Sequence, residues 1–259
     1  MNSVKFEIKR ELKSSLVMGL TLAGLMAVFM LFYPAFKEEA EAFEIILNNF
    51  PKEMLDSIGI NIESLFSLEG FFSYVYTFIS LGLGIYGMIL GLNIVGREKM
   101  NQSLDFIYSK PASRWKIYSS KIVSGLVVIL IVAIIMFVTL LLISRDQMTK
   151  TLFNLFISGF IIMFFFFGLG ALVAVVTRRL RNPIGISTSV TFIFFILLMM
   201  ARLLENNLMM NLTPFGYFEP TKIVMNELQT IHYAGFVVGV SLLIVIAGGI
   251  NHRKDVETV

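Results

Sequence analysis

Six long apolar stretches, none of them interrupted by a charged residue, account for most of this 259-residue chain. Each holds about 20 residues or more, enough for a helix rising roughly 1.5 Å per residue to cross a hydrocarbon core of about 30 Å. We therefore predict an all-α integral membrane protein with six transmembrane helices in a single domain, 1–259. The predicted spans cover approximately residues 15–36, 70–96, 117–143, 152–176, 183–204 and 233–250.

None of these stretches carries an acid, a base or a histidine well inside it. Proton relays and ion sites in membranes are built from such residues, so the pattern excludes an ion-coupled transporter and most membrane enzymes. The chain also has no cysteine, which excludes disulfides and thiolate catalysis. We predict no catalytic residue and no metal site, and we expect the energy for any work to enter from outside the bilayer.

Basic residues are distributed unevenly between the two sets of segments that connect the spans. The N-terminus, residues 97–121, residues 178–181 and the C-terminal tail together hold 15 of the 21 Lys and Arg, and the opposite set holds 6. Because positively charged segments stay in the cytoplasm, both termini are predicted to be cytoplasmic.

Two segments outside the spans are expected to be helical. Residues 4–13 (VKFEIKRELK) place apolar and basic side chains at helical spacing, which predicts an N-terminal interfacial helix that feeds the first span. The outer segment 37–69 holds eight acids against two lysines, and Pro51 is typical of the first turn of a second short helix within it. These short helices would lie against the outer leaflet or over a central opening.

Glycines within the second span form a pattern that does not indicate a nucleotide site. The sequence from Gly82 to Gly87 reads GxGxxG, but it lies inside an apolar span and not between a strand and a helix. Gly87 and Gly91, and likewise Gly235 and Gly239, have the GxxxG spacing that favours close contact between membrane helices.

A group of hydroxyl side chains lies in the fifth span. Ser187, Thr188 and Thr191 could line a route for a substrate. Alternatively, each hydroxyl bonds to the carbonyl four residues earlier, as such groups often do in membrane helices.

The segment between the second and third spans, residues 97–116, differs from an ordinary solvated loop. It combines charges of both signs with apolar and aromatic side chains, and Pro111 ends a predicted cytoplasmic helix within it. Such a mixture favours a docking surface for a cytoplasmic partner over an inert interfacial loop. The residues expected to make this contact are Glu98, Leu104, Asp105, Phe106, Lys110, Pro111 and Arg114.

With these features the chain resembles the ABC type-2 exporter permeases. In that family the corresponding loop often reads as an acid, then Gly-Thr-Leu-acid, then Pro-x-Ser-Arg and a Lys. The aromatic turn at residues 214–220 (PFGYFEP) is also similar to the family's last outer loop, whereas Gln102 and Ser103 stand where Gly-Thr is frequent. The residues that match the loop pattern are Glu98, Leu104, Asp105, Pro111, Ser113, Arg114 and Lys121.

The resemblance implies a mechanism and a set of partners. Two permease subunits, expected to be identical, would form a dimer in a bacterial plasma membrane. Each would dock through a coupling helix in residues 97–116 onto a separate ABC ATPase subunit, which binds the ATP and Mg²⁺. This chain itself would bind no cofactor and no nucleic acid. Secondary contacts at the inner face are expected from Lys9, Arg178, Arg179 and Arg181.

Among relatives, the chain looks closest to the small permeases of bacterial peptide exporters, such as those for bacteriocins, bacitracin immunity and phenol-soluble modulin toxins. The implied cargo is a hydrophobic or amphipathic peptide, and the implied biological role is resistance to antimicrobial peptides. The direction of export follows from the resemblance and not from the residues. Two other classes stay open: an integral-membrane enzyme, and a structural or sensory membrane protein that docks a partner other than an ATPase.

Overall fold

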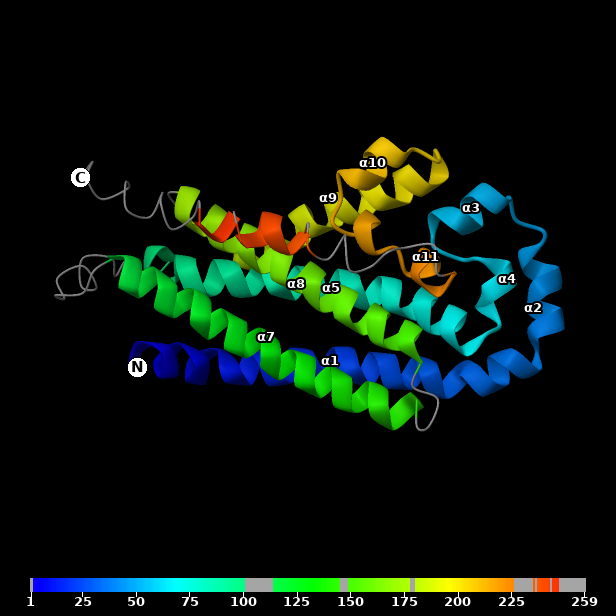
Figure 1. The fold of residues 1–259 in the computed structure, drawn as a ribbon, viewed down its shortest axis with the longest axis horizontal. Coiled ribbons are helices and arrows are strands. Elements are labelled where there is room, and N and C mark those ends of the chain that lie inside the picture. Colours follow the sequence, from blue (N-terminus) through cyan, green and yellow to red (C-terminus); the bar gives the residue numbers. More distant parts are fainter. Residues whose placement is uncertain are drawn as a thin grey trace.

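The computed structural model describes residues 2–100, 114–144, 149–177, 180–225, 235, 237–242 and 244–246, and within these ranges it is built of helices and turns without a strand (Figure 1). The helices are α1 (Asn2–Glu38), α2 (Ala40–Leu47), α3 (Lys52–Ser57), α4 (Ile62–Leu65), α5 (Leu68–Met100), α7 (Arg114–Ser144), α8 (Lys150–Val176), α9 (Pro183–Leu203), α10 (Asn207–Asn211), the 3-10 turn η1 (Gly216–Phe218) and α11 (Pro220–Val224).

Five of the described helices are long and apolar enough to cross a membrane, which confirms a helical, multi-pass membrane protein. They correspond to the first five predicted spans: α5, α7 and α8 extend a few residues beyond the predicted ends, α1 begins 13 residues earlier, and α9 ends one residue earlier. The sixth predicted span lies partly outside the described residues, and its described part falls within an apolar helix, Val237–Ile246. The predicted cytoplasmic helix, too, lies for the most part outside them, in 101–113.

The N-terminal segment differs from the prediction, because α1 runs without a break through residues 4–13 into the first span. The prediction of a separate interfacial helix is therefore wrong. No proline or glycine interrupts the chain between residues 4 and 18, and the Ser15 hydroxyl donates to the carbonyl of Leu12 without disturbing the helix. Glu7 and Glu11 are buried, so this part of α1 faces other helices.

Two pairs of parallel helices form the body of the protein, α5 with α8 and α1 with α7 (Figure 1). Glycines allow the backbones of α5 and α8 to approach closely. A Cβ atom at Gly91 would lie 2.7 Å from the backbone nitrogen of Ala171, and one at Gly170 would lie 3.2 Å from that of Leu92. The predicted contact at Gly91 is thus present, whereas a Cβ at Gly235 or Gly239 would meet no described atom within 4 Å.

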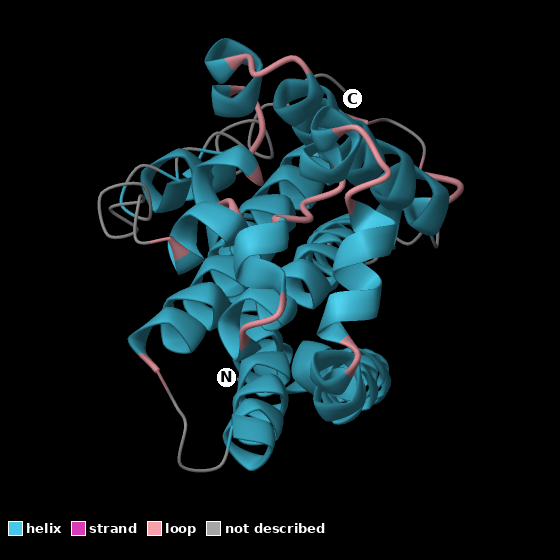
Figure 2. Cartoon of the chain, turned by 90° about the vertical axis from the view of Figure 1, so that its right-hand side faces the viewer, coloured by secondary structure: helices cyan, strands magenta, loops and turns pink. Residues whose placement is uncertain are grey.

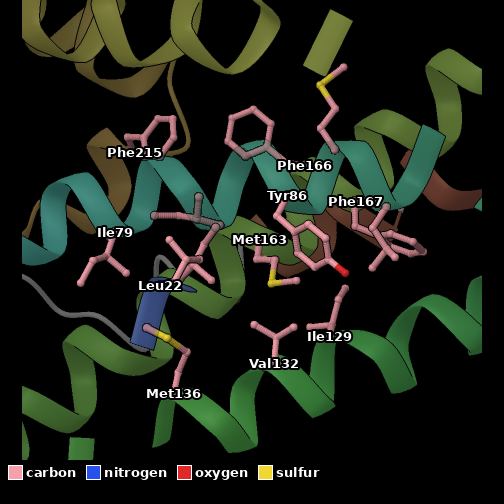
Figure 3. Packing of buried hydrophobic residues seen from close by; sticks show 14 of the residues in the cluster. Leu22, Ile79, Tyr86, Ile129, Val132, Met136, Met163, Phe166, Phe167 and Phe215 are labelled. Atoms are coloured by element: carbon pink, nitrogen blue, oxygen red, sulfur yellow. The ribbon is translucent and has the colours of Figure 1, made fainter. Parts of the chain in front are cut away.

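The core between these pairs is filled by large side chains from all four helices and from the aromatic turn (Figure 3). Phe215 of the turn packs against Phe166 of α8, with ring centroids 5.4 Å apart, and against Phe195 of α9 at 5.7 Å. The labelled core residues are Leu22, Ile79, Tyr86, Ile129, Val132, Met136, Met163, Phe166, Phe167 and Phe215.

The short helices gather at one end of the bundle, where α1 and α9 end and α5 begins (Figure 2 views the molecule from this side). The predicted outer segment forms three short helices instead of one or two, and Pro51 directly precedes α3 as its N-cap. We call this the cap end. The opposite end holds the first residues of α1, α7 and α9 and the last residues of α5 and α8, and we call it the base (Figure 1).

Candidate functional site

Five charged side chains are buried together at the base, where α1, α5 and α7 meet. None is more than 9% exposed, although charged residues are almost never fully buried unless they are paired. We call this group the basal ionic cluster. Its members are Glu7, Glu11, Arg97, Glu98 and Lys121.

Arg97 connects α5 to α1. Its Nη1 donates to Oε2 of Glu7 at 2.6 Å, and its Nη2 donates to Oε1 of Glu11. Glu7 and Glu11 are four residues apart, so both carboxylates lie on one face of α1 and reach the same guanidinium.

Glu98, the next residue, connects α5 to α7. It accepts a hydrogen bond at Oε2 from Nζ of Lys121, which also donates to the carbonyl of Ile94 at 2.8 Å. Lys99 follows, and its Nζ donates to the carbonyls of Val175 and Thr177 at the end of α8, with 3.2 Å to the latter.

Three consecutive residues of α5 therefore hold three different helices. Each residue advances a helix by about 100°, so the side chains of Arg97, Glu98 and Lys99 point in three directions, toward α1, α7 and α8. The five buried members comprise three acids and two bases, and the half-buried Lys99 adds a third base beside them. Such a buried group is stable only while it is complete, because removal of one partner leaves an uncompensated charge at a cost of about 3–5 kcal/mol.

The cluster adjoins the predicted docking segment. Arg97 and Glu98 belong to both, and Arg114 is the first residue of α7. The remaining predicted docking residues, Leu104, Asp105, Phe106, Lys110 and Pro111, lie outside the described residues.

Two of the predicted secondary contacts lie on the surface at the same end. Lys9 is exposed on α1, and Arg181 is exposed just before α9. Arg178 and Arg179 fall outside the described residues.

The hydroxyl side chains predicted in the fifth span do not belong to the basal ionic cluster. Ser187 and Thr191 are fully buried on α9, and the Thr191 methyl group would lie 3.1 Å from a Cβ at Gly84 of α5. Among the described residues neither oxygen has a hydrogen-bond partner, so the bond to the preceding turn is not made. Thr188 is half-buried. A substrate route along these residues stays a prediction.

Sequence reasoning missed the partners Glu7, Glu11 and Arg97. A signal was available, since two acids four residues apart interrupt an otherwise basic N-terminal segment, and charges of alternating sign follow the second apolar stretch directly. Within the described residues, no group of three His, Cys, Asp or Glu side chains could hold a metal ion.

A family model described as ABC-2 family transporter protein matches residues 1–248 of the chain. No curated protein and no solved structure matches it.

Proposed function

As a member of the ABC-2 family of transporter proteins, this chain is a membrane permease of an ABC transporter, and we propose that it moves a hydrophobic or amphipathic peptide outward. The family implies a partner ABC ATPase. In the proposal, two ATPase subunits that bind ATP and Mg²⁺ drive a dimer of two identical permeases in a bacterial plasma membrane, with both termini in the cytoplasm.

The observation that carries the proposal is the position of Arg97, Glu98 and Lys99. They stand at the end of α5, where the chain enters the proposed docking segment, and they connect α5 to α1, α7 and α8. A displacement of the docking segment by the ATPase would therefore be passed to four helices at once. Charged hydrogen bonds suit this task because they are directional and strong when buried.

The cargo assignment is supported by the amino-acid composition of the chain. The apolar spans offer no charged group midway through the membrane, which disfavours a strongly polar cargo. The chain also holds 25 Phe and 15 Met, side chains that adapt to varied apolar partners. The peptide class itself rests on the resemblance to peptide-exporter permeases.

The test is ATP hydrolysis by the partner ABC ATPase, reconstituted in liposomes together with the permease. We expect amphipathic helical peptides to stimulate hydrolysis more than sugars or inorganic ions do. We also expect Glu98→Gln, which removes the ion pair with Lys121, to retain the bound ATPase but to lose most of the stimulation.

Lys13→Gln is the matched control, because Lys13 is a charged residue on the part of α1 near the base that lies exposed and is not among the residues named for docking or secondary contacts. Full stimulation in Glu98→Gln would contradict the coupling role. Stimulation by a polysaccharide carrier, with no response to any peptide, would move the cargo to another class.

A further inference from the structure

The first turns of α1 carry opposite charges on opposite sides. Glu7 and Glu11 are buried against α5. Lys9 lies two residues from each of them, about 200° around the helix axis, and is exposed. Lys5 and Arg10 are exposed as well. The fold therefore turns both acids of residues 4–13 inward, so that the charged side chains on the outer side of these turns are all cations.

An aromatic side chain lies among these cations. Phe6 is 62% exposed, and it stands between Lys9 and Arg10 around the helix axis because it precedes them by three and four residues. We call Lys5, Phe6, Lys9 and Arg10 the basic strip. A helix face that combines cations with an aromatic side chain is typical of segments that lie at the surface of a membrane.

The basic strip points in the same direction as the apolar side chains that follow it on α1. Leu16 and Val17 come seven residues after Lys9 and Arg10, which brings a helix back to within about 20° of the same direction. Both are exposed, Val17 by 58% of its surface. Since α1 is unbroken and lies along one edge of the bundle (Figure 1), the strip continues the side of the span that faces the hydrocarbon.

The strip also lies at the height where a membrane changes from acyl chains to head groups. Arg97, the first charged residue after the apolar stretch of α5, bonds to Glu7 and Glu11. These turns of α1 therefore stand level with the edge of the hydrocarbon core. The helix rises about 7.5 Å from Lys5 to Arg10, which is close to the head-group layer of about 5–8 Å on each side of a bilayer.

We propose that the basic strip binds the head groups of anionic phospholipids, with Phe6 at the boundary between head groups and acyl chains. The phosphate oxygens of these lipids accept charge-assisted hydrogen bonds from lysine and arginine. Each cation beside an anionic membrane surface strengthens binding about fivefold. The inference goes beyond the proposed function, because binding of a lipid requires neither a cargo nor an ATPase.

The ATPase is the alternative partner for this surface, since the family resemblance assigns Lys9 to a secondary contact with it. The direction of the strip favours lipid. Its side chains point away from the bundle on the same side as Leu16 and Val17, whereas an ATPase docked on residues 97–116 would lie beyond the end of the bundle. A measurement without the ATPase separates the two partners.

The test is native mass spectrometry of the purified permease in detergent, titrated with phosphatidylglycerol and with phosphatidylcholine of the same acyl chains. We expect phosphatidylglycerol to bind at least about tenfold more tightly, because several cations act on its net charge. The combined change Lys5→Gln, Lys9→Gln and Arg10→Gln should remove most of this preference. Raising the ammonium acetate concentration should reduce it in the native protein, since salt screens exposed charges.

The matched control combines Lys37→Gln, Lys52→Gln and Lys150→Gln, which removes three exposed cations distant from the base and changes the net charge equally. It should retain the preference for phosphatidylglycerol. Equal binding of the two lipids to the native protein would overturn the proposal even if a variant does not fold, and so would a preference that persists in the strip variant. If that variant keeps the preference but no longer co-purifies with the ATPase, the strip belongs to the ATPase interface instead.

Discussion

Arg97 shows how a single buried side chain secures the N-terminal half of α1. It is the member of the basal ionic cluster that bonds to both Glu7 and Glu11, and all three side chains are less than 10% exposed. A helix surface this polar would otherwise face lipid head groups, which is the arrangement that the sequence suggested. The paired charges instead hold these turns against α5.

We expect Arg97→Ala to destabilise the protein by about 3–5 kcal/mol, because it leaves two buried carboxylates without their cation. The measurement is thermal unfolding of the purified permease in detergent. Arg181→Ala, an exposed change at the same end, should stay within about 0.5 kcal/mol of the native protein. The triple change Glu7→Gln, Glu11→Gln, Arg97→Met should cost less than Arg97→Ala alone; equal losses would argue against the pairing.

Which residues carry the site was only partly predictable from the sequence. Glu98 was named from its place in the loop pattern, and Lys121 matched the same pattern, yet nothing in the sequence paired the two. Ion pairs between helices depend on how the helices are rotated and how far they are displaced along their axes. Neither quantity is encoded in spacing along one helix, so the partners of Arg97 could not be derived.

At the scale of the helices, the contact between α5 and α8 depends on residues without side chains. Gly91 faces the backbone of α8 at Phe167 and Ala171, and Gly170 faces the backbone of α5 in return. The spacing of Gly87 and Gly91 predicted a close helix contact, and the starts and ends of the long helices, except the start of α1, were also close to the predicted spans. The partner helix and the unbroken course of α1 were not predictable, since both depend on packing between helices.

We expect Gly91→Ala to destabilise the protein by about 1–3 kcal/mol, because the added methyl group overlaps backbone atoms that cannot move aside. Thermal unfolding in detergent measures the effect. Gly24→Ala is the matched control, since Gly24 is also inside a membrane helix but has open space where a Cβ would lie. It should be neutral or stabilising by up to about 1 kcal/mol, as alanine favours helix. Equal effects of the two changes would contradict the close contact.

For the whole molecule, the two ends differ in chemistry as well as in shape. Among the described residues, the base carries the basic first turns of α1 and Arg181, and the cap end carries the acidic segment 37–69 on α2, α3 and α4. By the positive-inside rule we expect the base to lie in the cytoplasm and the cap end outside.

The absence of native cysteine allows this orientation to be tested with single substitutions. Asn48 and Asn182 are exposed at the cap end and at the base, respectively. We expect Asn48→Cys to react with an impermeant thiol reagent in intact cells, and Asn182→Cys to react only after the membrane is opened. Labelling of Asn182→Cys from outside would reverse the orientation.

The pairing of the long helices has a mechanical consequence. Because their backbones are in close contact, α5 and α8 are expected to move as one rigid unit. We expect α1 and α7 to move as a second unit. Buried ion pairs connect the two helix pairs at the base. At the cap end, α1 contacts α5 mainly through aromatic rings, such as Tyr33 and Phe36 on Phe71. Aromatic rings can slide past one another more easily than buried ion pairs can separate. We therefore expect the two helix pairs to move apart at the cap end while they stay connected at the base, where the ATPase would act.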